Sequence, residues 1–218
     1  MKPILLTGFE PFGGESINPS EEIARALNGR TVAGHAVVGS LLPCVYGTAI
    51  KELKHLMKLH QPMLVVCVGQ AGGRAEITPE RVAINIDDAR IPDNAGQQPI
   101  DKSIVKNGPA AYWSTLPIKA IVQELRKHHI AAAVSQTAGT FVCNHVFYGL
   151  MHALREQEAV RGGFIHVPYL PEQTERPDSG ITDKPSMPLA KMLAGIELAL
   201  DTAVKYRRDV RKAGGATS

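Results

Sequence analysis

Cysteine is the residue type in this sequence that most directly offers nucleophilic chemistry, and the chain has three of them. Cys67 lies inside the apolar run 64–68, where a thiol packs like a small hydrophobic side chain. Cys44 follows a proline at a predicted strand end, and nothing near it in the sequence supplies a base or a positive field. Cys143 stands where a predicted strand turns into a helix, so helix N–H groups could lower its pKa and bind an oxyanion. Position alone leaves two interpretations open for Cys143, a nucleophile or a buried thiol at a helix start.

A nucleophilic thiol needs a base, and the eight histidines differ in where they can point. His145 follows Cys143 by two positions on the same predicted helix and projects from the opposite side, and His152 lies more than ~13 Å along that axis. His166 ends an apolar strand, at the edge of an open α/β sheet where ligand sites form. Both a base and a satisfied core histidine fit that position. The others occupy a polar turn or polar helix ends, which favours solvated positions: His35, His55, His60, His128 and His129.

Three carboxylates near another predicted strand could orient an imidazole, namely Glu80, Asp87 and Asp88, and spacing cannot choose among them. We interpret Asp87, Asp88 and Asp93 as turn and strand-end residues rather than metal ligands, because paired histidine ligands are absent. The glycine turns at 8–14 and 69–73 lack the residues that nucleotide-binding loops require. We therefore predict neither a metal nor a nucleotide cofactor.

Apolar segments and amphipathic helical segments alternate along the chain. The helix that follows residue 18 has a start signature, with Asn18 at the N-cap, Pro19 at N1 and Glu21 at N3. Predicted strands cover 4–6, 37–42, 63–68, 82–86, 130–134 and 164–167. Predicted helices run to about 27 and over 46–59, 118–129, 143–156 and 190–206.

This alternation predicts one α/β domain, with a largely parallel sheet and helices on both of its faces. We expect the segments 63–68 and 82–86 to share that sheet. No linker divides residues 1–218, and the longest structureless stretch, 171–188, is interpreted as a functional loop. The basic tail at about 207–218 is expected to fray.

Composition narrows the function classes further. The chain has 218 residues, of which 44% are hydrophobic and 21% charged, as in an ordinary globular protein. A net charge of +3 and 5% aromatic residues argue against nucleic acid as a partner. An odd number of cysteines points to a reducing compartment. Without a signal-peptide pattern or a long apolar run, we expect a cytoplasmic protein that does not bind membranes.

Four separated motifs resemble the pyroglutamyl peptidase I family, also called the pyrrolidone-carboxylate peptidases. They lie at 6–14 (LTGFEPFGG), followed by Asn18 and Pro19, and at 69–85 (GQAGGRAEITPERVAIN), 134–144 (VSQTAGTFVCN) and 164–171 (FIHVPYLP). The likeness extends from about residue 5 to residue 200. It implies an α/β/α sandwich with a partly mixed, twisted sheet, a cytosolic cysteine peptidase without cofactor, and a homo-oligomer, either a dimer or a tetramer.

The resemblance also implies site residues and a reaction. Cys143 would be the nucleophile, His166 the base and Glu80 the orienting carboxylate. Arg90 would lie near the oxyanion. The implied reaction cleaves the amide bond after an N-terminal pyroglutamyl residue of a peptide and releases 5-oxoproline through a thioester. The implied substrate pocket consists of Phe9, Phe12, Gln70, Ile91, Phe141 and Val142.

Two other functions remain as alternatives at this point. One is a non-catalytic module of nucleosidase-like architecture that binds a small ligand, and the other is a cysteine amidase of different specificity. Asn18 likewise has two interpretations, a helix cap or a substrate contact.

Overall fold

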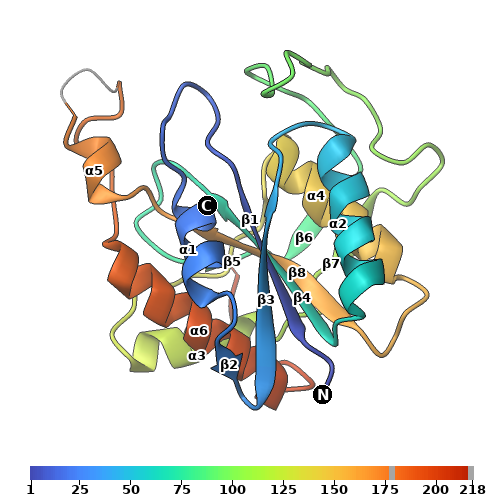
Figure 1. The fold of residues 1–218 in the computed structure, drawn as a ribbon, viewed down its shortest axis with the longest axis vertical. Coiled ribbons are helices and arrows are strands. Elements are labelled where there is room, and N and C mark those ends of the chain that lie inside the picture. Colours follow the sequence, from blue (N-terminus) through green and yellow to red (C-terminus); the bar gives the residue numbers. More distant parts are fainter. Residues whose placement is uncertain (177–179, 216–218) are drawn as a thin grey trace.

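The computed structural model describes residues 1–176 and 180–215, and a six-stranded sheet forms its centre (Figure 1). The strands β3, β1, β4 and β8 run parallel, whereas β2 and β5 pair antiparallel at the two edges. This arrangement confirms the predicted sheet, which is largely parallel and partly mixed. In spatial order the strands are β2 (Thr31–Val32), β3 (His35–Leu42), β1 (Ile4–Phe9), β4 (Leu64–Gln70), β8 (Arg161–Val167) and β5 (Thr78–Pro79).

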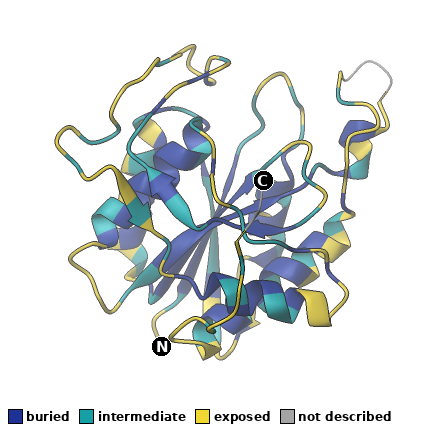
Figure 2. Ribbon diagram, turned by 180° about the vertical axis from the view of Figure 1, so that it is seen from behind, coloured by how far each residue is buried: buried dark blue, intermediate teal, exposed yellow. Residues whose placement is uncertain are grey.

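Helices cover both faces of this sheet. One face carries α1 (Pro19–Leu27), α3 (Ile118–Lys127) and α6 (Leu189–Lys205), and the other carries α2 (Thr48–His60) and α4 (Val142–Leu154) (Figure 1). Alternate side chains of β4 enter the two cores, with Val66 on the α1 face and Cys67 on the α4 face. Figure 2 shows the buried strands between helices whose outer sides are exposed. The α/β/α sandwich is confirmed, and Cys67 is a core residue as predicted.

The start of α1 follows the predicted capping pattern. The Asn18 side chain is buried, and its Oδ1 accepts two hydrogen bonds from Ser20. One comes from the Ser20 backbone N–H at 3.0 Å and the other from the Ser20 hydroxyl at 2.8 Å. Its amide nitrogen donates to the Glu10 carbonyl at 3.1 Å. The cap interpretation of Asn18 is therefore confirmed, and the side chain also joins the helix to the loop that follows β1.

Replacing Asn18 with alanine is expected to lower the free energy of unfolding by about 1 to 2 kcal/mol, because a buried cap and its partners are lost. Urea unfolding measures this change. Asn18→Asp keeps the acceptor for Ser20 and should lose less stability than Asn18→Ala. An Asn18→Asp variant with full stability but no enzymatic activity would instead favour a contact with substrate.

The segment 82–86 does not join the main sheet, contrary to our prediction. Its strand β6 (Val82–Ile84) pairs antiparallel with β7 (Ala111–Trp113) in a separate two-stranded sheet. Ala83 is buried in the core beside α4, while its two neighbours are half-buried. The covered face of this strand carries Ala83 and not Val82 or Ile84, so the apolar alternation in the sequence does not mark the side that is buried. The strand ends before Asn85, whose side chain exchanges two hydrogen bonds with the Val105 backbone instead.

The segment 130–134 also forms no regular strand, contrary to our prediction. It lies beside β5 and makes irregular parallel contacts, with isolated bridges from Ile77 to Ala132 and from Glu80 to Ser135. Regular pairing is limited because β5 has two residues, one of which is Pro79 without an N–H donor. The segment nevertheless leads the chain along the sheet edge toward α4.

The two regions expected to lack structure are partly ordered. The loop 171–188 contains a short helix, α5 (Pro171–Thr174), and its residues 177–179 lie outside the described part. In the tail, the Asp209 carboxylate accepts from the N–H groups of Lys119 and Ala120 at the start of α3, and the Gly214 carbonyl accepts from Arg81. Residues 207–215 therefore lie against α3, and residues 216–218 are not described.

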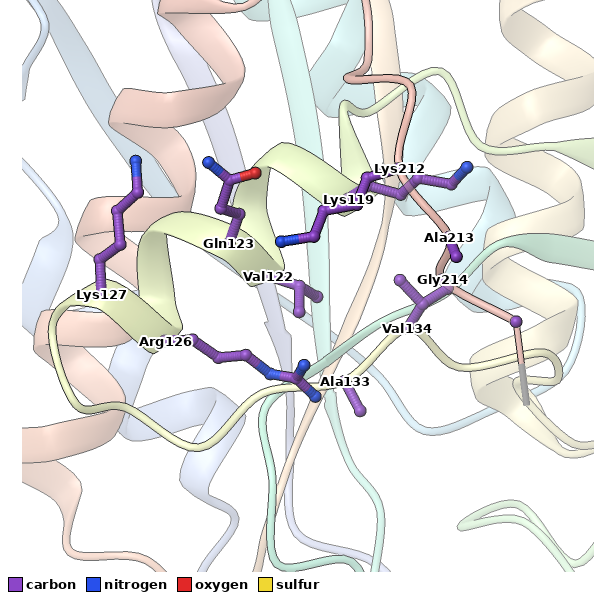
Figure 3. A pocket seen from close by; sticks show the side chains of 11 residues that line it. Lys119, Val122, Gln123, Arg126, Lys127, Ala133, Val134, Lys212, Ala213 and Gly214 are labelled. Carbon is purple, nitrogen blue, oxygen red and sulfur yellow. The ribbon is translucent and has the colours of Figure 1, made fainter. Parts of the chain in front are cut away.

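A surface pocket of about 620 Å³ is lined by residues of α3, by Ala133 and Val134 and by tail residues 212–215 (Figure 3). The side chains of Lys119 and Arg126 lie on either side of Val122 in that view. Arg126 donates to the Ala132 carbonyl at 2.7 Å and so fastens the helix to the segment below it. None of the residues implied by the resemblance lines this pocket.

Candidate active site

Cys143 occupies the first turn of α4, directly after a tight turn at 137–140. Phe141 is the N-cap of the helix, and Gly139 adopts a positive φ of 74° that favours glycine. The Cys143 side chain is half-buried. Its sulfur lies over Gly69 of β4, since a Cβ atom built on Gly69 would be 2.9 Å from that sulfur. The absence of a side chain at Gly69 therefore makes room for the thiol.

His166 is the neighbour of Gly69 in the sheet, since the two residues are paired in the register of β4 and β8. Only 3% of His166 is exposed, and its ring packs against Phe164 with centroids 4.8 Å apart. The sheet thus brings His166 next to the strand residue over which the Cys143 sulfur lies. Gly69 and His166 both stand near the carboxyl ends of parallel strands, where ligand sites form in an open α/β sheet.

Glu80 is the carboxylate that reaches His166. It follows β5 and is fully buried, and its Oε1 accepts a hydrogen bond from Nδ1 of His166 at 2.7 Å. An ionised carboxylate only accepts hydrogen bonds, so Nδ1 carries a proton, and in the neutral imidazole Nε2 is then an acceptor. The structure therefore distinguishes Glu80 from Asp87 and Asp88, which spacing in the sequence could not do.

A second donor, Arg74, binds the same carboxylate. Arg74 donates from Nη1 to Glu80 Oε1 at 2.7 Å, and the pair forms a salt bridge. Burial alone would raise the pKa of Glu80, but the hydrogen bond and charge of His166, the Ser135 hydroxyl and the charge of Arg74 together hold it below its ordinary value. Glu80 is therefore ionised in this site. Our sequence reasoning missed Arg74, because an arginine on an irregular loop belongs to no periodic pattern.

The surroundings of Cys143 act on its thiol in the direction opposite to our prediction. Burial raises the pKa of Cys143 well above its ordinary value, and the nearby Cys44 and Glu80 raise it further, while Arg74 acts in the other direction. Desolvation by burial is the largest of these effects on the thiol. A protonated thiol becomes nucleophilic only if a neighbouring group takes its proton.

Aromatic rings gather beside the start of α4. The rings of Phe12 and Phe141 are 5.8 Å apart, and Tyr46 meets Phe141 edge to face at 5.7 Å. Phe9 is 2% exposed and packs in the core against Phe164, at 6.2 Å. Phe12 and Phe141 are thus brought together at the surface of this cluster, with Phe9 beneath. Tyr46 was not foreseen, since its ring comes from the loop before α2.

The remaining residues implied by the resemblance occupy different places around the site. Val142 is fully buried as the first residue of α4, and the Ile91 side chain lies next to Gly13 on the loop after β1. The Gln70 side chain accepts from Gln173 on α5 at 2.9 Å. Arg90 is exposed on the loop after β6, where its charge acts on Tyr169. Among the described residues, the Arg90 side chain makes no hydrogen bond with Glu80, Cys143 or His166.

A separate histidine–carboxylate pair lies on the other side of α4, where we expected His145 to point. Nδ1 of His145 donates a hydrogen bond to the Asp87 carboxylate at 2.8 Å, and its Nε2 accepts one from the Gly47 backbone N–H at 2.9 Å. Both ring nitrogens are thus occupied within the protein, which leaves none for a reaction. His152 likewise contacts the Tyr112 hydroxyl at 2.8 Å. Over the described ranges, no three histidine, cysteine, aspartate or glutamate side chains cluster as a metal site.

Comparison with known proteins identifies the family of this site. The family model described as pyroglutamyl peptidase matches residues 2–206 of the chain. The chain belongs to the pyroglutamyl peptidase family. The resemblance that four motifs indicated is confirmed, and the match spans Glu80, Cys143 and His166.

Relatives and solved structures agree with this membership. Pyrrolidone-carboxylate peptidase of Bacillus cytotoxicus is 54% identical over 218 residues, which is 100% of each chain, and that of Cupriavidus taiwanensis is 57% identical over 217 residues, or 99% of each. The crystal structure of pyroglutamyl peptidase I from Bacillus amyloliquefaciens has a TM-score of 0.93 at 50% identity, covering 97% of this chain and 99% of that one. Pyrrolidone carboxyl peptidase from Thermococcus litoralis reaches 0.92 at 41% identity, covering 98% and 100%.

The length and composition of the helices show whether one of them could span a membrane. No helix in the described part of the chain is both long enough and apolar enough to cross a lipid bilayer.

Proposed function

We propose that this member of the pyroglutamyl peptidase family cleaves the amide bond after an N-terminal pyroglutamyl residue, with Cys143 as nucleophile, His166 as base and Glu80 as the orienting carboxylate. The observation that carries the assignment is the 2.7 Å hydrogen bond from His166 to buried Glu80, next to the strand residue that supports the thiol. This order of thiol, imidazole and carboxylate is the arrangement that nucleophilic acyl transfer requires.

In the first step, the sulfur of Cys143 bonds to the pyroglutamyl carbonyl carbon while Nε2 of His166 takes the thiol proton. Because burial keeps the thiol protonated, the proton leaves as the substrate is attacked. The carbonyl oxygen becomes an oxyanion close to the first turn of α4, where N–H groups that lack helical partners can donate to it. Glu80 stabilises the imidazolium, since its carboxylate accepts from Nδ1.

In the second step, the imidazolium of His166 gives its proton to the leaving amine, and the C–N bond breaks to leave a thioester on Cys143. Water then attacks the thioester carbonyl while His166 accepts a proton from it. The C–S bond breaks, the thiol is restored and 5-oxoproline leaves. One peptide and one water molecule thus give 5-oxoproline and a shortened peptide with a free amine.

The pocket proposed for the pyroglutamyl ring is largely uncharged, as an uncharged lactam requires. Phe12 and Phe141 would form its apolar walls, with support from Phe9, Ile91 and Val142. Gln70 adds a polar group at the end of β4. Arg90 is proposed to approach the oxyanion from its exposed loop when substrate is bound.

The setting of the reaction is also part of the proposal. We infer a cytoplasmic enzyme that acts as a homo-oligomer, a dimer or a tetramer. Three unpaired cysteines favour a reducing compartment, in which the nucleophilic thiol stays reduced. Analytical ultracentrifugation of the purified protein tests the proposed homo-oligomer. A protein that stays monomeric at every concentration would contradict it.

The purified protein tests the reaction through chromogenic amides of pyroglutamate, proline and glutamate. A site that pairs with the lactam should favour the pyroglutamyl amide in kcat/KM by ~10⁴ or more, because the prolyl and glutamyl groups lack the lactam and leave the polar groups of the site unpaired. Similar rates with prolyl or glutamyl amides would favour an amidase of broader specificity. Binding of a pyroglutamate analogue without any hydrolysis would favour a non-catalytic module.

Replacing Gly69 with alanine is expected to lower kcat/KM for the pyroglutamyl amide by ~10²-fold, because a Cβ there lies 2.9 Å from the Cys143 sulfur and displaces it. Steady-state kinetics measures the loss. Gly215→Ala is the control, since a Cβ at Gly215 meets open space. Wild-type kinetics in Gly69→Ala would show that the thiol does not react from this position.

A further inference from the structure

Arg74 joins two parts of the chain that flank the candidate site. Its Nη1 donates to Glu80 Oε1 and to the Thr78 hydroxyl, both at 2.7 Å. Its Nη2 donates to the Thr137 carbonyl at 3.0 Å. Thr78 and Glu80 belong to the edge that holds His166, whereas Thr137 belongs to the turn that leads to Cys143. A single guanidinium therefore connects the carboxylate side of the site with the nucleophile side.

We propose that Arg74 is a positioning residue for the reaction, which holds the Glu80 carboxylate toward His166 and fixes the turn before Cys143. The inference rests on the proposed function and adds a residue to it. Arg74 acts through Glu80 and through the turn, and no contact with substrate is required of it.

One oxygen of the Glu80 carboxylate binds both His166 and Arg74. Glu80 Oε1 accepts from both His166 and Arg74, at 2.7 Å each, so one carboxylate oxygen joins the two donors. Glu80 Oε2 is buried and has no hydrogen-bond partner in the described part of the chain. A partial rotation of the carboxylate would therefore weaken both charge-assisted bonds at once, and a half-turn would only exchange the two oxygens. Arginine suits this role because its planar fork reaches three acceptors at once.

The charge of Arg74 acts on the groups that exchange protons. The groups that act electrostatically on Glu80 are His166 on β8, the Ser135 hydroxyl and Arg74 itself, and Glu80 in turn acts on Cys143 at the start of α4. Glu80 and His166 are joined by a hydrogen bond of 2.7 Å. Removing the nearby positive charge must make this pair bind a proton at higher pH, whichever partner carries it.

The test compares Arg74→Leu, Arg74→Gln and Arg74→Lys with the wild type in the pH dependence of kcat/KM for the pyroglutamyl amide. We expect Arg74→Leu and Arg74→Gln to move the acid limb upward by about one pH unit. We also expect kcat at the optimum to fall by ~10-fold or more, with little change in KM. Arg74→Lys keeps the charge and should leave the acid limb in place, with a smaller loss of kcat.

A matched control is available in Arg81, the cation next to Glu80 in the sequence. Its side chain donates to Gln136 and to the Gly214 carbonyl, each at 2.8 Å, and makes no hydrogen bond with Glu80. Arg81→Leu should therefore leave the acid limb unmoved. The rate at which iodoacetamide alkylates Cys143 gives a second measurement without turnover. Its pH dependence should move upward in Arg74→Leu and stay unchanged in Arg81→Leu.

Two results would overturn the inference. One is an unchanged acid limb and kcat in the uncharged Arg74 variants, and the other is an equal loss of activity at every pH, which indicates a structural role only. If Arg74→Leu does not fold, Arg74→Gln and Arg74→Lys decide by the same criterion. Wild-type hydrolysis of the pyroglutamyl amide is unaffected by these outcomes, so failure of the inference and failure of the proposed function are distinguishable.

Discussion

Replacing Cys143 with alanine is expected to lower kcat for the pyroglutamyl amide by ~10⁴-fold or more, while the protein keeps its fold. The variant has no atom that can form the acyl-enzyme, and removal of a nucleophile of this kind costs rates of that order. The side chain is small and half-buried, so its loss should disturb the packing little. The measurement is the kcat of purified protein, with thermal unfolding to verify the fold.

The other two cysteines provide controls for this result. Cys44 and Cys67 are only 3% and 0% exposed, so substrate cannot reach either sulfur, whereas Cys143 is half-buried. Cys44→Ala should retain most of the activity. Turnover that persists in Cys143→Ala would contradict the assignment, and turnover that disappears in Cys44→Ala would move the nucleophile to Cys44.

Replacing Glu80 with glutamine is expected to lower kcat by ~10³ to 10⁴-fold with a much smaller change in KM. The amide can present its N–H₂ to Nδ1 of His166, which would place the imidazole proton on Nε2, where the thiol must deliver its own. Arg74 would also lose the negative charge that it holds at 2.7 Å. Steady-state kinetics with the pyroglutamyl amide measures both parameters.

The second histidine–carboxylate pair supplies a matched control for Glu80. Asp87→Asn removes the charge beside His145 on the far side of α4, where neither group is part of the proposed reaction. This variant should be less stable than the wild type, but kcat per folded molecule should stay the same. Equal losses of kcat in Glu80→Gln and Asp87→Asn would argue that Glu80 supports the fold rather than the chemistry.

Local signals in the sequence were sufficient for much of the sandwich. The cap at Asn18 and the apolar run of β4 act within a few residues, so they could be recognised without the fold. The segments 82–86 and 130–134 were misassigned because their pairing depends on distant partners. β6 pairs with β7, nearly 30 residues further along, and Pro79 restricts the pairing of 130–134.

The site divides in the same way. Cys143 and His166 could be singled out because a helix start and a strand end are visible in the sequence. Glu80 could not be chosen over Asp87 without the family resemblance, since both carboxylates bind a histidine and only the fold shows which one. Arg74 could not be predicted, because its three acceptors come together only when the edge strand meets the turn before α4.

The central claim is that a thioester forms on Cys143. Its most direct test is to mix enzyme with a pyroglutamyl ester or amide, quench with acid within one turnover and map the modified peptide by mass spectrometry. We predict one pyroglutamyl group on the peptide that contains Cys143, absent from Cys143→Ala and lost on incubation at neutral pH. A pyroglutamyl group on any other residue, or active turnover without an adduct under conditions that trap thioesters, would contradict the proposed mechanism.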